Sequence, residues 1–247
     1  VAFAADWGLT GVAIVGPNTT ATLGRNDEIH IYDAMREEVD RLRYGDEDFD
    51  STYRARDASA QVCSGALGGD SIYDWSESMV GDAWGSFAAA SGDIGTPGMF
   101  LYVDCPPIGT NYCMATANST GAPATMSASG TRLASNNDLT LIADNLPNNS
   151  FGIFISSMTQ DFVPNAGASQ GNLCLGGNIG RHSRPGEIVQ SGMTGQVELL
   201  LNLANMPSPT GTTAVLPGET WNFQIWYRDA NPTVTSNYSH GLEIMFN

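Results

Sequence analysis

The most regular alternation of apolar and polar positions lies at the end of the chain. Residues 221, 223, 225 and 227 are all large and apolar, with the period of two that a strand with one buried face requires. A shorter alternating run occupies residues 242–247, and turn-forming Asn, Pro, Thr, Ser and Gly residues separate the two runs. This pattern predicts two C-terminal strands that close a sheet. Their inward-facing residues are Trp221, Phe223, Ile225, Tyr227, Leu242, Ile244 and Phe246.

A second apolar run lies near the beginning of the chain and also has the composition of a strand. Gly8, Gly11 and Gly16 interrupt it, and Pro17 follows it. It is predicted to form the first strand of its own sheet or, alternatively, to add to the sheet edge of a neighbouring subunit. The residues that such an assembly would bury are Trp7, Leu9, Val12, Ile14 and Val15.

Residues 26–57 are the most charged part of the chain. Met35, Val39 and Leu42 follow one another at i, i+4 and i+7, and charged residues lie between them. This spacing predicts a short amphipathic helix near residues 33–43, with a solvated hairpin as the alternative. Either element would lie at the surface.

An acidic loop follows, in which four Asp residues have a spacing that resembles a calcium-binding loop. Ser51 stands where the glycine of the sharp turn belongs, and Arg54 occupies a ligand position. A solvated acidic loop is therefore the preferred interpretation, with no cofactor expected and calcium as the alternative. The candidate ligands are Asp46, Asp48, Asp50 and Asp57.

The middle of the chain suggests a domain boundary. Residues 99–103 are five consecutive apolar residues that predict a strand, and Cys105-Pro106-Pro107 follows them. Of the 26 acidic residues, 18 precede Cys105. We therefore expect an acidic N-terminal β domain over residues 1–104 and a C-terminal β-sandwich over residues 105–247.

Composition fixes the fold class and narrows the class of partner. Short apolar runs between many turns, with 28 Gly and 12 Pro, indicate a mainly β chain, which we expect to form two sandwiches of the jelly-roll or immunoglobulin-like kind in tandem. All ten basic residues are Arg, and the formal net charge is −16. Nucleic acid is thus not expected as a partner, because phosphate contacts need clustered basic residues. No run of 18 apolar residues is present, so membrane insertion is not expected either.

The four cysteines are spaced too widely for a CxxC metal or redox site. Their even number predicts two disulfides and an oxidising, extracellular compartment, whereas four thiols in a cytosolic protein are the alternative. Three connectivities exist, and we favour sequential pairing. The predicted disulfides are Cys63–Cys105 and Cys113–Cys174.

Catalytic patterns are weak. Ser169 lies in a G-x-S-x-G sequence with Asp161 and His182 nearby, but a nucleophile elbow needs a strand before the serine and a helix after it, and neither is predicted. His30 and His240 are isolated, so no zinc site is predicted. We expect no enzymatic activity.

Several segments of the second half together resemble a known but uncharacterised module. They are NYCMATANSTGAPATMSASG at 111–130, NNDLTLIADNLP at 136–147, FGIFISS at 151–157, QGNLCLGGNIGR at 170–181, and the ending GETWNFQIWYRD with TSNYSHGLEIMF. The module is a β-sandwich that recurs at the C-terminal end of large exported proteins from environmental Gram-negative bacteria, and the resemblance covers about Asn111 to Asn247. It implies a secreted scaffold in which Cys113 and Cys174 pair, and it supplies no reaction or cofactor.

These observations predict a secreted, non-enzymatic structural protein. We expect it to assemble with copies of itself, by strand addition, into an extracellular filament or a layer at the cell surface. The alternative is an extracellular module that binds a glycan or another partner through exposed aromatic residues such as Trp226 and Tyr238.

Overall fold

The computed structural model of the chain describes residues 2–11, 24–45, 57–68 and 72–247. The fold is mainly β, as the sequence predicts, and it divides into two compact units, Val1–Pro106 (unit 1) and Pro107–Asn247 (unit 2). Cys105 belongs to unit 1 together with Cys63. The two units are described separately below.

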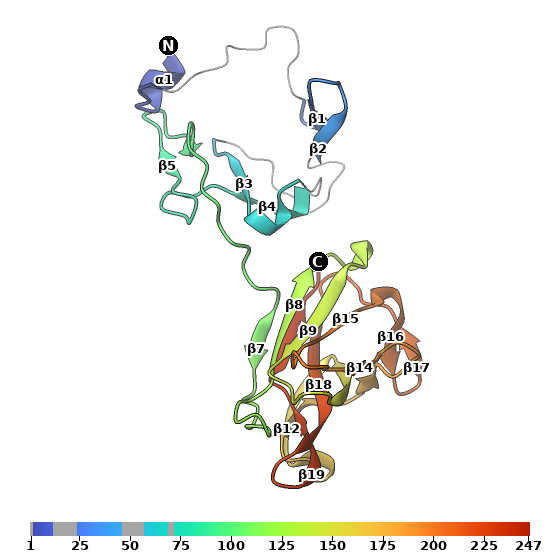
Figure 1. Cartoon of the computed structure of the whole chain (residues 1–247). Helices are drawn as coiled ribbons and strands as arrows, with labels where there is room; N and C mark the ends of the chain where they lie inside the picture. Colours follow the sequence, from blue (N-terminus) through green and yellow to red (C-terminus); the bar gives the residue numbers. More distant parts are fainter. Residues whose placement is uncertain (1, 12–23, 46–56, 69–71) are drawn as a thin grey trace. The chain divides into compact units, whose positions relative to one another are not determined.

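Unit 2 contains a seven-stranded antiparallel sheet around the long strand β18. In the order β13-β10-β18-β20-β7, each strand hydrogen-bonds to the next, while β14 pairs with β10 and β19 pairs with β18. Strands β7, β14, β18 and β19 of this sheet are labelled in Figure 1. The strands are β7 (Thr110–Tyr112), β10 (Phe151–Ser157), β13 (Gly180–Arg181), β14 (Ile188–Gln190), β18 (Thr220–Ala230), β19 (Val234–Tyr238) and β20 (Gly241–Met245).

A three-stranded antiparallel sheet supplies the other half of the sandwich core. Its order is β15-β9-β8, formed by Val197–Leu200, Leu139–Asp144 and Thr125–Gly130. Strand β9 alternates buried with half-buried residues along its whole length, as a strand with one covered face should. The main core combines Met126, Leu139, Leu141, Ala143, Val197 and Leu199 with Phe154, Trp221, Phe223, Ile225, Tyr227, Leu242, Ile244 and Phe246. The predicted inward face of the two C-terminal strands is thus confirmed.

The polar face of β18 is also buried at Asn222 and Gln224, which the alternation did not predict. A hairpin of β11 (Thr159–Pro164) and β12 (Asn172–Gly176) contacts the sheet, and a small second core of Ile155, Leu175 and Tyr238 forms on this side of it. Gln224 is fully buried here, and its amide is satisfied by backbone groups. The Nε2 group donates to the carbonyls of Asn172 (2.8 Å) and Ser239 (2.7 Å), and Oε1 accepts from the Cys174 N–H (3.0 Å).

Short elements complete unit 2. They are β16 (Met206–Ser208), β17 (Gly211–Thr213) and the 3-10 turns η3 (Ala134–Asn136), η4 (Ala166–Ala168) and η5 (Leu203–Asn205).

Unit 1 is built from three separate two-stranded hairpins within its described residues. The sandwich expected for this half therefore remains a prediction. The elements are α1 (Ala2–Asp6), β1 (Asp27–Tyr32), β2 (Glu38–Tyr44), β3 (Ala60–Val62), η1 (Ser64–Ala66), η2 (Ile72–Asp74), β4 (Trp75–Glu77), β5 (Phe87–Ala88) and β6 (Ile94–Gly95).

The helix predicted near residues 33–43 is wrong, because β1 and β2 form the alternative hairpin there. The Asp33 carboxylate accepts hydrogen bonds from the N–H groups of Met35 (2.8 Å) and Glu37 (2.9 Å), which fixes a turn. Arg36 has a φ of 66°, outside the helical range. Met35 and Val39 are 83% and 59% exposed, so the apolar residues at helical spacing share no buried face.

Two strand predictions in unit 1 fail within the described residues. Residues 2–6 form the short helix α1 and no strand includes residues 7–11, while Val12, Ile14 and Val15 of the first predicted strand lie outside the described residues. Residues 99–103 belong to no strand and have no sheet partner among the described residues. Residues 99–103 have the apolar composition of a strand, but a strand exists only where a second strand pairs with it.

Candidate functional site

Both predicted disulfides are confirmed. Cys63 pairs with Cys105 within unit 1, and Cys113 pairs with Cys174 within unit 2. Two disulfides indicate an oxidising compartment. Among the helices that the structure describes, none is long and apolar enough to span a bilayer.

The acidic loop contributes one described residue. Asp46, Asp48 and Asp50 lie outside the described residues. Asp57 is the first described residue after them and has a φ of 58°. The Asp57 carbonyl accepts the N–H of Ile94 at 2.8 Å, which ties the end of the loop to β6. Within the described ranges, no group of three or more His, Cys, Asp or Glu side chains is arranged to hold a metal ion. The calcium loop remains a prediction.

The G-x-S-x-G sequence does not form a nucleophile elbow. Ser169 follows the 3-10 turn η4 and precedes strand β12, the reverse of the strand-to-helix turn that the motif requires. Its side chain is buried, and its hydroxyl donates to the Ser236 carbonyl at 2.7 Å. His182 contacts a different serine.

That serine is Ser156, and the Ser156–His182 pair was missed from the sequence. A hydrogen bond of 3.1 Å joins Ser156 Oγ to His182 Nε2, and the two residues are 0% and 2% exposed. The two residues are 26 positions apart in the sequence and share no motif, and the Ser156–Gly180 register of β10 and β13 brings them together. Burial, with the nearby positive charge of Arg184, lowers the pKa of His182 to about 4. The pair is thus neutral and closed to a substrate in this structure.

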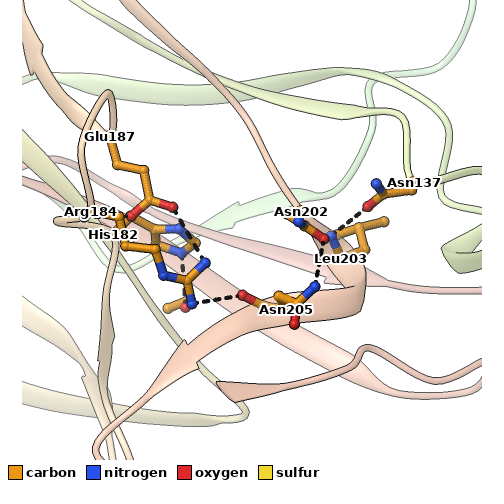
Figure 2. Close-up of polar contacts among 8 residues, drawn as sticks. Asn137, His182, Arg184, Glu187, Asn202, Leu203 and Asn205 are labelled. Atoms are coloured by element: carbon orange, nitrogen blue, oxygen red, sulfur yellow. Dashed lines mark hydrogen bonds and ion pairs between the residues drawn. The ribbon is translucent and has the colours of Figure 1, made fainter. Parts of the chain in front are cut away.

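Beside this pair, side-chain contacts from Arg184 and Asn137 hold residues 202–208, a segment called the strap below. Figure 2 shows Arg184 and Glu187 together, with Arg184 reaching Asn205. The Arg184 guanidinium donates to the Asn205 carbonyl at 3.0 Å and forms an ion pair of 3.7 Å with Glu187. From the other side, Asn137 Oδ1 accepts the Leu203 N–H at 2.6 Å (Figure 2). The strap in turn buries Leu203 and Met206 in the main core.

The two aromatic residues proposed for glycan binding have different surroundings. Tyr238 is buried in the small core and offers no open ring face. Trp226 is half-buried against the same core, and the Arg228 guanidinium lies 5.0 Å from the centre of its ring. The pair therefore does not form an exposed platform of two rings.

Of the five N-terminal residues proposed for assembly, Trp7 and Leu9 lie in the described part of the chain. Trp7 packs edge-on against Phe87 of its own unit, with ring centres 5.3 Å apart. The Asp6 carboxylate accepts from the N–H (2.8 Å) and the hydroxyl (2.7 Å) of Ser91, so the segment around α1 docks on the β5–β6 hairpin. Leu9 closes the end of α1 through its N–H, which donates to the Ala4 carbonyl at 2.8 Å. Val12, Ile14 and Val15 lie outside the described residues.

Residues 99–103, called the unpaired segment below, form an exposed apolar stretch of unit 1. Met99, Phe100, Leu101 and Tyr102 are 46%, 51%, 42% and 79% exposed. The segment is uncharged and is fixed at its ends, where the Met99 N–H donates to Thr96 and the Val103 carbonyl accepts from Ser64. It has the composition of a strand and no strand beside it in the described part of the chain.

Comparison with known proteins identifies no relative. No family model, no curated protein and no solved structure matches this chain.

Proposed function

We propose that this protein is a secreted structural subunit that assembles with copies of itself, by strand addition, into an extracellular filament or surface layer. The observation that supports this proposal is the unpaired segment. Five consecutive apolar residues without charge have a high preference for strands, and such a segment left unpaired acts as a template for pairing with another chain. The two disulfides fit the extracellular location.

The energetic argument favours covering the segment. A large apolar side chain that becomes fully buried contributes about 1.5–3 kcal/mol, and strand addition also pairs backbone N–H and C=O groups that otherwise face water. Four large side chains in the segment are at least 42% exposed, so a partner gains from each of them.

A second copy of the chain offers a matching edge. Strand β1 pairs only with β2 among the described residues, so no described strand lies at its other edge. Ile29 and Ile31 on this strand are 40% and 53% exposed. Pairing the unpaired segment of one copy with β1 of the next is a heterologous contact, and contacts of this type propagate into rings or filaments.

The proposal predicts that Tyr102→Asp disperses the assembly. Tyr102 is 79% exposed, so a charge there leaves the fold of unit 1 intact but is buried without a partner in the interface. Val234→Asp is the matched control, because Val234 is 87% exposed in unit 2. Light scattering after size exclusion and negative-stain electron microscopy should show polymers for the wild type and the control, and monomers for Tyr102→Asp. A wild-type protein that stays monomeric at its highest soluble concentration contradicts the proposal.

A further inference from the structure

A cavity of about 520 Å³ lies in unit 1 beside the docked N-terminal helix. Aromatic rings, carboxylates and an amide all reach its wall. The lining residues that matter are Phe3, Trp7, Asp57, Gln61, Asp93 and Thr96. Its volume is within the range of small-molecule sites in proteins.

The aromatic wall is held in place by packing. Trp7 is fixed edge-on against Phe87, and Phe3 lies next to it with a ring-centre distance of 6.1 Å. Gly95 lies beside this wall and allows the close approach of Ser59, because a Cβ atom at this position would lie only 2.8 Å from Ser59 Oγ. Phe3 is 48% exposed, so its ring remains open to a ligand.

Two of the donor groups on the wall are already hydrogen-bonded within the protein. Gln61 Nε2 donates to Thr96 Oγ1 at 2.8 Å, and the Ser59 hydroxyl is hydrogen-bonded to Ser78 at 2.9 Å. The carboxylates of Asp57 and Asp93 are acceptors on the lining, and no hydrogen bond to either is observed within the described chain. A ligand for this cavity must therefore supply the donors.

The charge around the cavity also favours a ligand that supplies donors, because it favours a cation. Among the described residues no basic side chain lines it, and residues 1–104 contain 18 acidic residues against six Arg. A negative potential of this kind repels anions and concentrates cations. A planar cation that carries several N–H donors matches both the aromatic rings and the carboxylates, and the guanidinium group has this form.

We infer that the cavity of unit 1 binds a guanidinium group, which stacks on Phe3 and Trp7 and donates to Asp57 and Asp93. This inference does not depend on self-assembly. The guanidinium belongs to a free ligand or to an arginine side chain of another chain, and the two sources share the same chemistry.

Argininamide is the probe, and citrullinamide, which replaces the guanidinium with a neutral urea, is its matched control. Calorimetric titration of the full chain should show binding of argininamide and none of citrullinamide. Asp93→Asn and Asp57→Asn should each weaken binding about tenfold or more, since the negative charge that strengthens the hydrogen bond to the guanidinium is lost. Asn tolerates the left-handed φ of 58° at residue 57, so the second variant keeps the backbone.

Asp74→Asn is the control for charge alone, because Asp74 is exposed in the same unit and does not line the cavity. It should leave the affinity unchanged. The inference is overturned if the folded wild type binds no argininamide, if citrullinamide binds equally well, or if Asp74→Asn weakens binding as much as the cavity variants do.

The source of the guanidinium is distinguished with assembled protein. If saturating argininamide disperses the assemblies, the occupant is an arginine of a second copy; if the assemblies persist, the occupant is a separate ligand. The titration itself can be carried out on monomeric Tyr102→Asp, so a failure of the self-assembly proposal leaves this test intact.

Discussion

At the scale of single residues, the buried polar groups of unit 2 decide where its stability is sensitive. Gln224 and His182 are 0% and 2% exposed, and both have hydrogen-bond partners within the protein. Of these two side chains, only that of His182 can gain a proton. A charged imidazole inside the sandwich would lose its solvation without an acidic partner, which is why burial lowers the pKa of His182 to about 4.

This pKa predicts an acid sensitivity. The pKa of a His in the unfolded chain is about 6.5. As the pH falls from about 6.5 towards about 4, the unfolded chain therefore binds the proton before the folded chain does. Neutral His182 makes its full contribution to the free energy of unfolding above pH about 6.5. This contribution is lost as the pH falls, and below pH about 4 the loss in the free energy of unfolding reaches about 3 kcal/mol.

The measurement is the free energy of unfolding of wild type and His182→Gln, from urea titrations between pH about 7 and about 4. Other acidic groups titrate in both proteins, so the difference between the two isolates His182. Gln keeps a hydrogen bond to Ser156 and has no charge to gain, so its stability should fall less steeply. Parallel pH profiles would show that His182 is already protonated or solvated in the folded protein.

At the scale of elements, the strap shows how an irregular segment closes a sandwich edge. Residues 202–208 follow β15 and carry Leu203 and Met206 into the core, while Arg184 and Asn137 hold the backbone from two sides. Asn137 has a φ of 50°, a conformation that Asn and Gly accept more readily than other residues.

Asn137→Gly should therefore keep the backbone conformation and lose only the side-chain hydrogen bond to Leu203. The expected loss is about 1 kcal/mol in the free energy of unfolding, with faster amide hydrogen exchange at Leu203 and Val215. Asn149→Gly is the matched control, because Asn149 has a φ of 54° and an exposed side chain. Equal effects of the two substitutions would mean that the Asn137 side chain does not hold the strap.

The elements also show what a sequence can predict. The alternation at Trp221, Phe223 and Ile225 follows from local geometry alone, and the structure confirms it. The burial of Gln224 depends on a hairpin about 50 residues earlier in the chain, so no local pattern contains it. The same holds for Ser156 and His182, which meet only through strand register.

The wrong predictions have a local cause and a tertiary cause. In the charged region, the carboxylate of Asp33 stabilises a turn, and this interaction overrides the helical spacing of Met35 and Val39. In the unpaired segment the strand preference of the sequence is real, but no described residue of the same chain pairs with it. A sequence indicates a preference for strand without indicating which chain supplies the partner.

At the scale of the whole molecule, the two units differ in charge and in the completeness of their packing. Unit 2 has a large main core between two sheets, whereas unit 1 has three small hairpins and an exposed apolar segment within its described residues. An assembly that covers this segment would complete the packing of unit 1 with residues from a neighbour. This is the central claim of the proposed function.

Amide hydrogen exchange of the unpaired segment, compared between polymer and monomer, tests this claim most directly. Backbone N–H groups that enter an intermolecular ladder exchange slowly, while those that face water exchange fast. The account predicts that residues 99–103 and β1 become protected in polymers of the wild type and exchange fast in monomeric Tyr102→Asp, with unit 2 unchanged. Polymers in which residues 99–103 exchange as fast as in the monomer would contradict assembly through this segment.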